Sequence, residues 1–243
     1  SGFSVTLSAD GTIVAIGAYP NDATSGTVNT GDNRGHVRVY RYDANKITAQ
    51  MDQSLSNFGP IGWTRLGGDI DGETAIDYSG WSVALSADGT VVAIGAIAND
   101  GSGNLLTDSG HVRVYKYRAG KTAAQLTNSA PSATDFGPIG WDRLGADIDG
   151  EATNDGSGHS VSLSADGTTV AIGAPNNDGT FSNAGHVRIY TYNASTTYWV
   201  QVGADIDGLA ANEASGFSVS MPTANTVAIG APASNANGVA SGI

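Results

Sequence analysis

The sequence contains no cysteine, and this absence excludes several kinds of structure and chemistry at once. Without thiols the chain can form neither a disulfide framework nor a thiolate metal site, and it has no cysteine nucleophile. No stretch approaches the roughly 18 consecutive apolar residues of a membrane-spanning helix. We therefore expect no membrane insertion, and outside the cell the fold would have to rely on its core or on bound ions.

Basic residues are also scarce. Eleven Lys and Arg stand against 23 Asp and Glu, which gives a formal net charge of −12 at pH 7. Such a chain is repelled by nucleic acids and by anionic membranes, so we expect neither as a partner. Only 14% of the residues are charged and 7 are proline, whereas 34 are glycine. This composition argues against a charged disordered chain and favours short strands joined by turns.

What the sequence does contain is a repeat. The stretch SGHSVSLSADGTTVAIGA at residues 157–174 recurs nearly unchanged at residues 1–18 and 79–96, and in a divergent form at residues 215–231. Polar and apolar residues alternate before Ala-Asp-Gly, and an apolar run follows it. This pattern predicts two antiparallel strands around a tight turn, in which glycine accepts a positive φ. A period of this length indicates a repeat architecture.

Each full unit continues with two more strands. Gly-His-Val-Arg-Val-Tyr occurs at residues 35–40 and 110–115, and with Ile for the second Val at residues 185–190. Its period of two predicts a third strand. A fourth strand begins at a tryptophan in each unit, namely Trp63, Trp141 and Trp199. Four strands per unit predict an all-β, propeller-type array of four-stranded antiparallel blades.

The copies also set the boundaries within what we interpret as a single repeat array over residues 1–243. The units are blade 1 (residues 1–78), blade 2 (79–156), blade 3 (157–214) and a partial blade 4 (215–243), about three and a half blades in all. Inserts at residues 43–62 and 119–140 lengthen the first two units. The only place where we would allow a helix is in these inserts, for example near residues 123–126.

The repeated sequence motifs resemble the FG-GAP repeat of the integrin α-subunit propeller and of many secreted bacterial and algal proteins. Ser-Gly-x-Ser-Val stands where that pattern has Phe-Gly-x-Ser-Val, and Gly-Ala-Pro occurs at residues 173–175 and 230–232. Residues 110–115 resemble the strand that follows in the family. The resemblance implies a β-propeller located outside the cell or on its surface.

The chain departs from this family in two ways. The family carries a calcium loop in the first hairpin, whereas Ser-Ala-Asp-Gly is too short to wrap an ion. Integrin-like propellers have seven blades, so we expect that the array belongs to a longer chain, closes with fewer blades, or is completed by another copy.

Two acidic loops elsewhere carry residues that could hold Ca²⁺. Carboxylates occur at loop positions one, three, five and nine, and calcium prefers such oxygen ligands. These residues are Asp69, Asp71, Glu73 and Asp77 in the first loop and Asp147, Asp149, Glu151 and Asp155 in the second. In the third copy Leu209 takes the fifth position. The alternative is that Asp-x-Asp-Gly forms a turn in which the first carboxylate accepts backbone N–H groups.

Other features have both a structural and a binding interpretation. His36, His111 and His186 recur once per blade, so we expect them to lie too far apart to share one metal and to make structural hydrogen bonds. Trp63, Trp141 and Trp199 are expected to pack, and stacking on a sugar is the alternative. Asn193-Ala194-Ser195 is a glycosylation-type triplet.

The sequence favours a protein that is not an enzyme. Catalysis needs unlike residues converging on one site, whereas these loops are repeated, which suits adhesion, multivalent binding or assembly. We expect an extracellular structural or adhesive propeller module, with Ca²⁺ as its candidate ion. Its expected partners are other copies or further blades of a longer chain, with glycans as candidate ligands. The alternatives are a carbohydrate-binding, lectin-like propeller and a non-catalytic domain of a secreted enzyme.

Overall fold

The fold was analysed in a computed structural model that describes residues 2–21, 31–52, 57–101, 103, 105–125 and 137–234. These residues form β-strands and no helix, which confirms the all-β prediction. Near the position where a helix was allowed, Gln125 makes an antiparallel bridge with Gly137, and residue 126 lies outside the described part. No helix in the described ranges is long and apolar enough to cross a membrane.

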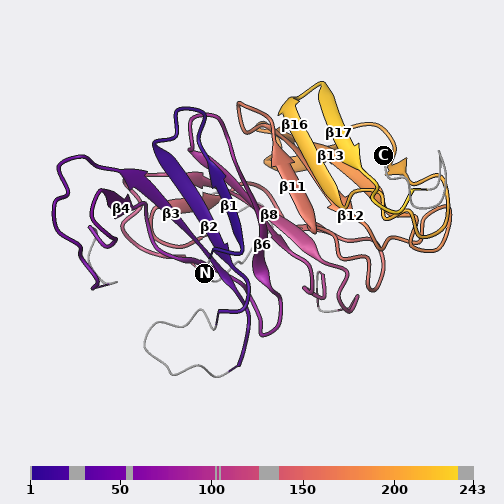
Figure 1. Cartoon of the computed structure of the whole chain (residues 1–243), viewed down its shortest axis with the longest axis horizontal. Coiled ribbons are helices and arrows are strands. Elements are labelled where there is room, and N and C mark those ends of the chain that lie inside the picture. The colour runs from indigo at the N-terminus through magenta and orange to yellow at the C-terminus, as the bar shows by residue number, and fades with distance from the viewer. Residues whose placement is uncertain are drawn as a thin grey trace.

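The strands form four antiparallel sheets, each drawn from one repeat (Figure 1). The first sheet contains β1 (Ser4–Leu7), β2 (Ile13–Ala18), β3 (His36–Tyr42), β4 (Trp63–Arg65) and β5 (Ile70–Asp71). The second contains β6 (Ser79–Leu85), β7 (Val91–Ala96), β8 (His111–Tyr117), β9 (Trp141–Arg143) and β10 (Ile148–Asp149). The third contains β11 (Ser160–Leu163), β12 (Thr169–Ala174), β13 (His186–Asn193), β14 (Tyr198–Gln201) and β15 (Ile206–Asp207). The fourth contains β16 (Ser218–Thr223) and β17 (Thr226–Gly230).

Each of the first three sheets has one strand more than the sequence predicts. In the first sheet, one edge of β3 pairs with β2, while its other edge pairs with β4 at one end and with β5 at the other. The fifth strand is the Ile-Asp dipeptide of the acidic loop, and it places Asp71 opposite His36. The acidic loop is therefore attached to the sheet and does not stand free.

Neighbouring sheets pack face to face. Ala15 and Val37 of the first sheet share a buried cluster with Leu85 and Val92 of the second, and the second and third sheets form an equivalent cluster. We call the face that carries Leu85 the leading face of its sheet and the opposite face the trailing face. Figure 1 shows the indigo first sheet and the yellow fourth sheet in opposite halves of the molecule. The described sheets do not close into a ring, so a propeller arrangement stays a prediction.

The same set of contacts, which we call a joint, connects each sheet to the next. In the first joint Ser4 Oγ donates to the carbonyl oxygen of Gly80 at 2.8 Å, and this carbonyl lies against Gly17, where any Cβ would collide with it. The same contacts recur between Ser82, Gly95 and Gly158, and between Ser160, Gly173 and Gly216. The motifs Ser-Gly-x-Ser and Ile-Gly-Ala therefore form the two sides of one joint. Its glycines allow the backbones of neighbouring repeats to approach closely.

Histidine–carboxylate clusters at the joints between repeats

The third strand of each repeat carries polar and aromatic side chains on its leading face. In β8 these are His111, Arg113 and Tyr115, and all three are buried. Val112 and Val114 alternate with them and pack on the other face. Buried polar groups require partners within the protein. The acidic loops supply the partners of Arg113.

In the second repeat, Asp147 binds two arginines. Arg113 donates through Nε and Nη2 to its two oxygens at 2.8 and 2.7 Å, and Arg143 Nη1 donates to it at 2.7 Å. Glu73 of the preceding repeat also pairs with Arg113. Desolvation raises the pKa of Asp147, but the hydrogen bonds and charge of Arg113 outweigh it, so the pKa lies well below its usual value. Asp147 is therefore the centre of an ion-pair network that reaches into the neighbouring repeat.

In the first repeat, Asp69 has the same role. It pairs with Arg38 and Arg65, each at 2.7 Å. Desolvation again acts against these pairs, and the net pKa of Asp69 is lowered. Desolvation, followed by the negative charge of Asp69, raises the pKa of Asp71, although solvent still reaches this side chain.

The carboxylates at the ninth loop position are buried and cap their own loops. Asp77 accepts hydrogen bonds from the N–H groups of Glu73 and Thr74 at 3.1 and 2.9 Å. Asp155 accepts from the N–H of Ala152 at 2.9 Å. The turn interpretation gave this role to the first carboxylate of the loop, which instead binds arginines. The cap belongs to the ninth carboxylate because the loop folds back over it.

Each predicted calcium loop thus distributes its four carboxylates among different partners. In the second loop, Asp147 binds arginines, Asp149 lies opposite His111, Glu151 extends toward the third repeat and Asp155 caps the loop. Binding of Ca²⁺ by all four carboxylates of either loop stays a prediction.

Other sets of ligating atoms do lie close together. Each joins one third-strand histidine to two carboxylates, with one atom per residue within 4.8 Å of the others. The sets are His36 with Asp69 and Asp71, His111 with Glu73 and Asp147, and His186 with Glu151 and Asp205. The histidines belong to separate sets, as their spacing predicts. Sequence reasoning missed the pairing of each imidazole with acidic loops, although both features recur with the same period.

The histidines of these sets are buried and have free ring nitrogens. Nε2 of His36, Nδ1 of His111 and Nδ1 of His186 have no hydrogen-bond partner among the described residues. Desolvation, followed by the charge of the nearby arginine, lowers the pKa of His36 and of His111 to about 4. At neutral pH these imidazoles are uncharged, which is the form that binds metals.

Two of the three recurring tryptophans connect neighbouring repeats. Trp141 is fully buried, and its Nε1 donates to the carbonyl oxygen of Leu66 at 2.9 Å. Trp199 donates in the same way to Leu144 at 2.7 Å. Trp63 packs against Tyr42, with ring centroids 5.5 Å apart. No face of Trp141 is open to a sugar.

Asn193, the residue of the glycosylation-type triplet, is exposed at the end of β13. Its side-chain oxygen accepts the N–H of Ser195 at 3.0 Å. The residue therefore shapes the turn between β13 and β14.

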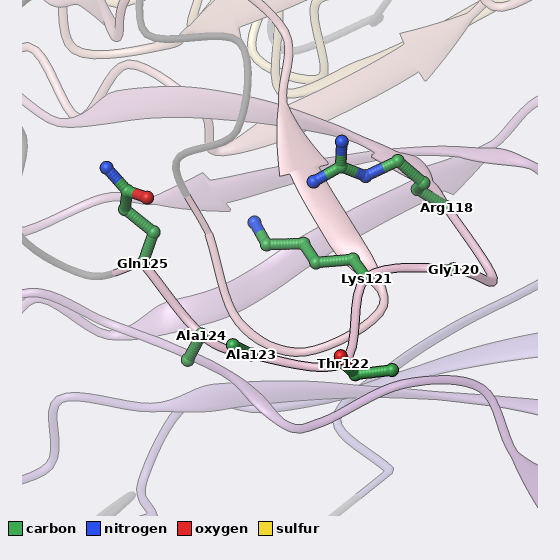
Figure 2. A pocket seen from close by; sticks show the side chains of 7 residues that line it. All are labelled: Arg118, Gly120, Lys121, Thr122, Ala123, Ala124 and Gln125. Atoms are coloured by element: carbon green, nitrogen blue, oxygen red, sulfur yellow. The ribbon is translucent and has the colours of Figure 1, made fainter.

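A pocket of about 410 Å³ lies in the insert of the second repeat, lined by residues 118 and 120–125 (Figure 2). Figure 2 shows Arg118 and Lys121 extending in the same direction from the loop. Both pair with Asp142, at 2.8 and 2.9 Å. Both cations in the wall of this pocket are thus already ion-paired with one carboxylate of the protein.

No protein-family model matches the chain, and no curated protein matches it. The resemblance to the FG-GAP repeat therefore rests on the sequence motifs alone and stays a prediction.

Proposed function

We propose that this chain is an extracellular structural or adhesive module, built of propeller-type blades, that assembles with sheets of its own kind. The FG-GAP resemblance supports the propeller arrangement and the extracellular location. The polar clusters support a non-catalytic role, because they are near copies placed at successive joints and do not bring unlike residues together at one centre.

The observation that carries the assembly proposal is the uncovered leading face of the first sheet. Val5 and Leu7 of β1 have exposed fractions of 58 and 56%. Their counterparts on β6 and β11 pack in the core against the preceding sheet. Covering an apolar face is worth about 25 cal/mol per Å² of buried area. The first sheet is thus built to receive another sheet.

The fourth sheet presents the matching half of a joint. Gly230 and Ser218 occupy the positions of Gly173 and Ser160, but the three atoms nearest to a Cβ built on Gly230 all belong to Ser218, whereas a backbone carbonyl of the next repeat is nearest at Gly173. At the other end, no atom lies within 4 Å of a Cβ built on Gly2. A second copy could place its Gly2 carbonyl over Gly230, where Ser218 Oγ would donate to it.

We infer that a second copy in a head-to-tail arrangement covers the open face, since its fourth sheet carries the matching half of the joint. Further blades of a longer chain are the alternative occupant. Head-to-tail contacts generate a ring when the rotation closes and a fibre when it does not. The lectin-like alternative has less support, because Trp141 is buried and Trp199 bonds to the neighbouring repeat.

The test is the mass of the native particle as a function of protein concentration, measured by light scattering. We expect oligomers that grow with concentration. Leu7→Glu places a charge in the contact and should give a monomer of 24.5 kDa. The control Leu105→Glu changes a residue that is 81% exposed elsewhere and should assemble like the wild type. A monomer at every concentration, or assembly that Leu7→Glu leaves unchanged, would refute the proposal.

A further inference from the structure

The three histidine–carboxylate sets differ in their number of arginines. Arg65 in β4 and Arg143 in β9 bind the first carboxylate of their loops. In β14 the equivalent residue is Gln201, whose amide donates to Asp205 at 2.6 Å. The third set therefore has one positive charge fewer than the other two.

The remaining arginine of the third set is directed mainly at a backbone group. Arg188 donates through Nη2 to the carbonyl oxygen of Asp149 at 2.7 Å. Its Nη1 lies 3.4 Å from Glu151. In the second set, by contrast, Arg113 pairs with both Glu73 and Asp147. The carboxylates of the third set are thus the least neutralised.

His186 places a buried nitrogen between these carboxylates. Its Nδ1 lies 3.6 Å from Asp205 Oδ2 and 3.9 Å from Glu151 Oε2, which is too far for a direct hydrogen bond. The residue is 1% exposed, and Nδ1 has no hydrogen-bond partner in the described structure. A buried polar atom without a partner is costly, so this nitrogen points to a ligand.

We propose that Glu151, His186 and Asp205 bind one divalent transition-metal cation of the Zn²⁺ type, which ties the second repeat to the third. One imidazole nitrogen with two carboxylate oxygens is a ligand set that zinc accepts, whereas calcium prefers oxygen ligands alone. This set differs from the four-carboxylate loop in which sequence reasoning placed Glu151.

The geometry suits such an ion. Ligand atoms bound to one tetrahedral zinc lie roughly 3.3 Å apart, given bonds of about 2.0–2.2 Å. The distances of 3.6 and 3.9 Å need only small side-chain movements to reach this value. The side chains of Glu151 and Asp205 are 46 and 27% exposed, so an ion can enter from solvent and keep a water as its fourth ligand.

The charge state of the imidazole is also suitable. Desolvation, followed by the positive charge of Arg188, lowers the pKa of His186. This direction favours the uncharged imidazole, which is the form that binds metals.

The proposal is tested by titrating metal-free protein that carries no histidine tag with ZnCl₂ in a calorimeter. We expect one Zn²⁺ per chain, and with CoCl₂ the intense visible absorption of a tetrahedral centre. Glu151→Gln and Gln201→Arg should each weaken binding at least about tenfold, the first by removing a ligand and the second by restoring the arginine of the other repeats. Glu73→Gln, the same change in the first repeat, should leave the affinity unchanged.

Circular dichroism of each variant checks the fold. The fold should persist because the Glu151 side chain is about half exposed and because Gln201→Arg copies the other repeats. Absence of zinc binding would overturn the proposal. So would zinc binding that both Glu151→Gln and Gln201→Arg leave unaltered in folded protein.

Discussion

At the scale of single residues, each hairpin of the first three repeats depends on one carboxylate. Asp88 accepts hydrogen bonds from Ser86 Oγ at 2.6 Å and from the Thr90 N–H at 2.9 Å. Gly89 beside it has a φ of 69°. The carboxylate therefore accepts turn donors that have no backbone acceptor. Desolvation acts to raise the pKa of Asp88, but these hydrogen bonds outweigh it, so the pKa is lowered.

We predict that Asp88→Ala lowers the free energy of unfolding by about 0.5–1 kcal/mol at pH 7, which is the usual net contribution of a solvent-accessible hydrogen bond. Since the folded pKa lies below the usual 3.8, this contribution is present above that value and is lost as the pH falls through the folded pKa. Urea denaturation at pH 7 and at pH 3 measures both effects. Asp88→Asn, which keeps an acceptor, should remove only the part of the pH dependence that Asp88 contributes. Equal stability of Asp88→Ala and the wild type would contradict the prediction.

At the scale of elements, the close approach of neighbouring sheets sets the choice of residue in the second strand. A Cβ on Gly95 in β7 would collide with the carbonyl oxygen of Gly158 in the next repeat. Because a backbone atom cannot move aside as a side chain can, Gly95→Ala should separate the two sheets locally. We predict a loss of about 1–3 kcal/mol, the usual cost of overpacking.

The matched control is Gly120→Ala, because a Cβ at this position meets no atom within 4 Å. It should change the unfolding free energy by less than about 0.5 kcal/mol. Chemical denaturation compares the two variants, and equal losses would show that the joint tolerates a Cβ.

Some strands could be predicted from the sequence and others could not. The hairpin β6–β7 and the strand β8 follow from local alternation and from Asp-Gly, which act over a few residues. The two-residue strand β10 could not be predicted, because the pairing of Ile148 with Val112 joins distant parts of the chain. For the same reason the acidic residues were identified as a group, but the pairing of Glu73 with Arg113 in the next repeat was not.

At the scale of the whole molecule, stability in a stacked array is approximately a sum of repeat and joint contributions. The inner strands β7 and β12 are buried along their whole length, since a sheet covers each of their faces. β1 and β17 consist of half-buried and exposed residues, because each belongs to an end sheet. Local opening should therefore begin at the ends of the array and reach the middle last.

Hydrogen exchange followed by mass spectrometry tests this gradient. In the Leu7→Glu variant, which should keep the copies apart, we predict that amides of β7 and β12 exchange slowest and those of β1, β16 and β17 fastest. If the proposed zinc site exists, saturating Zn²⁺ should slow exchange in β13 and β15, because the ion would hold the third repeat to the second, and should leave β1 unchanged. Uniform protection across all sheets would mean that the chain unfolds as one cooperative unit, and it would contradict this prediction.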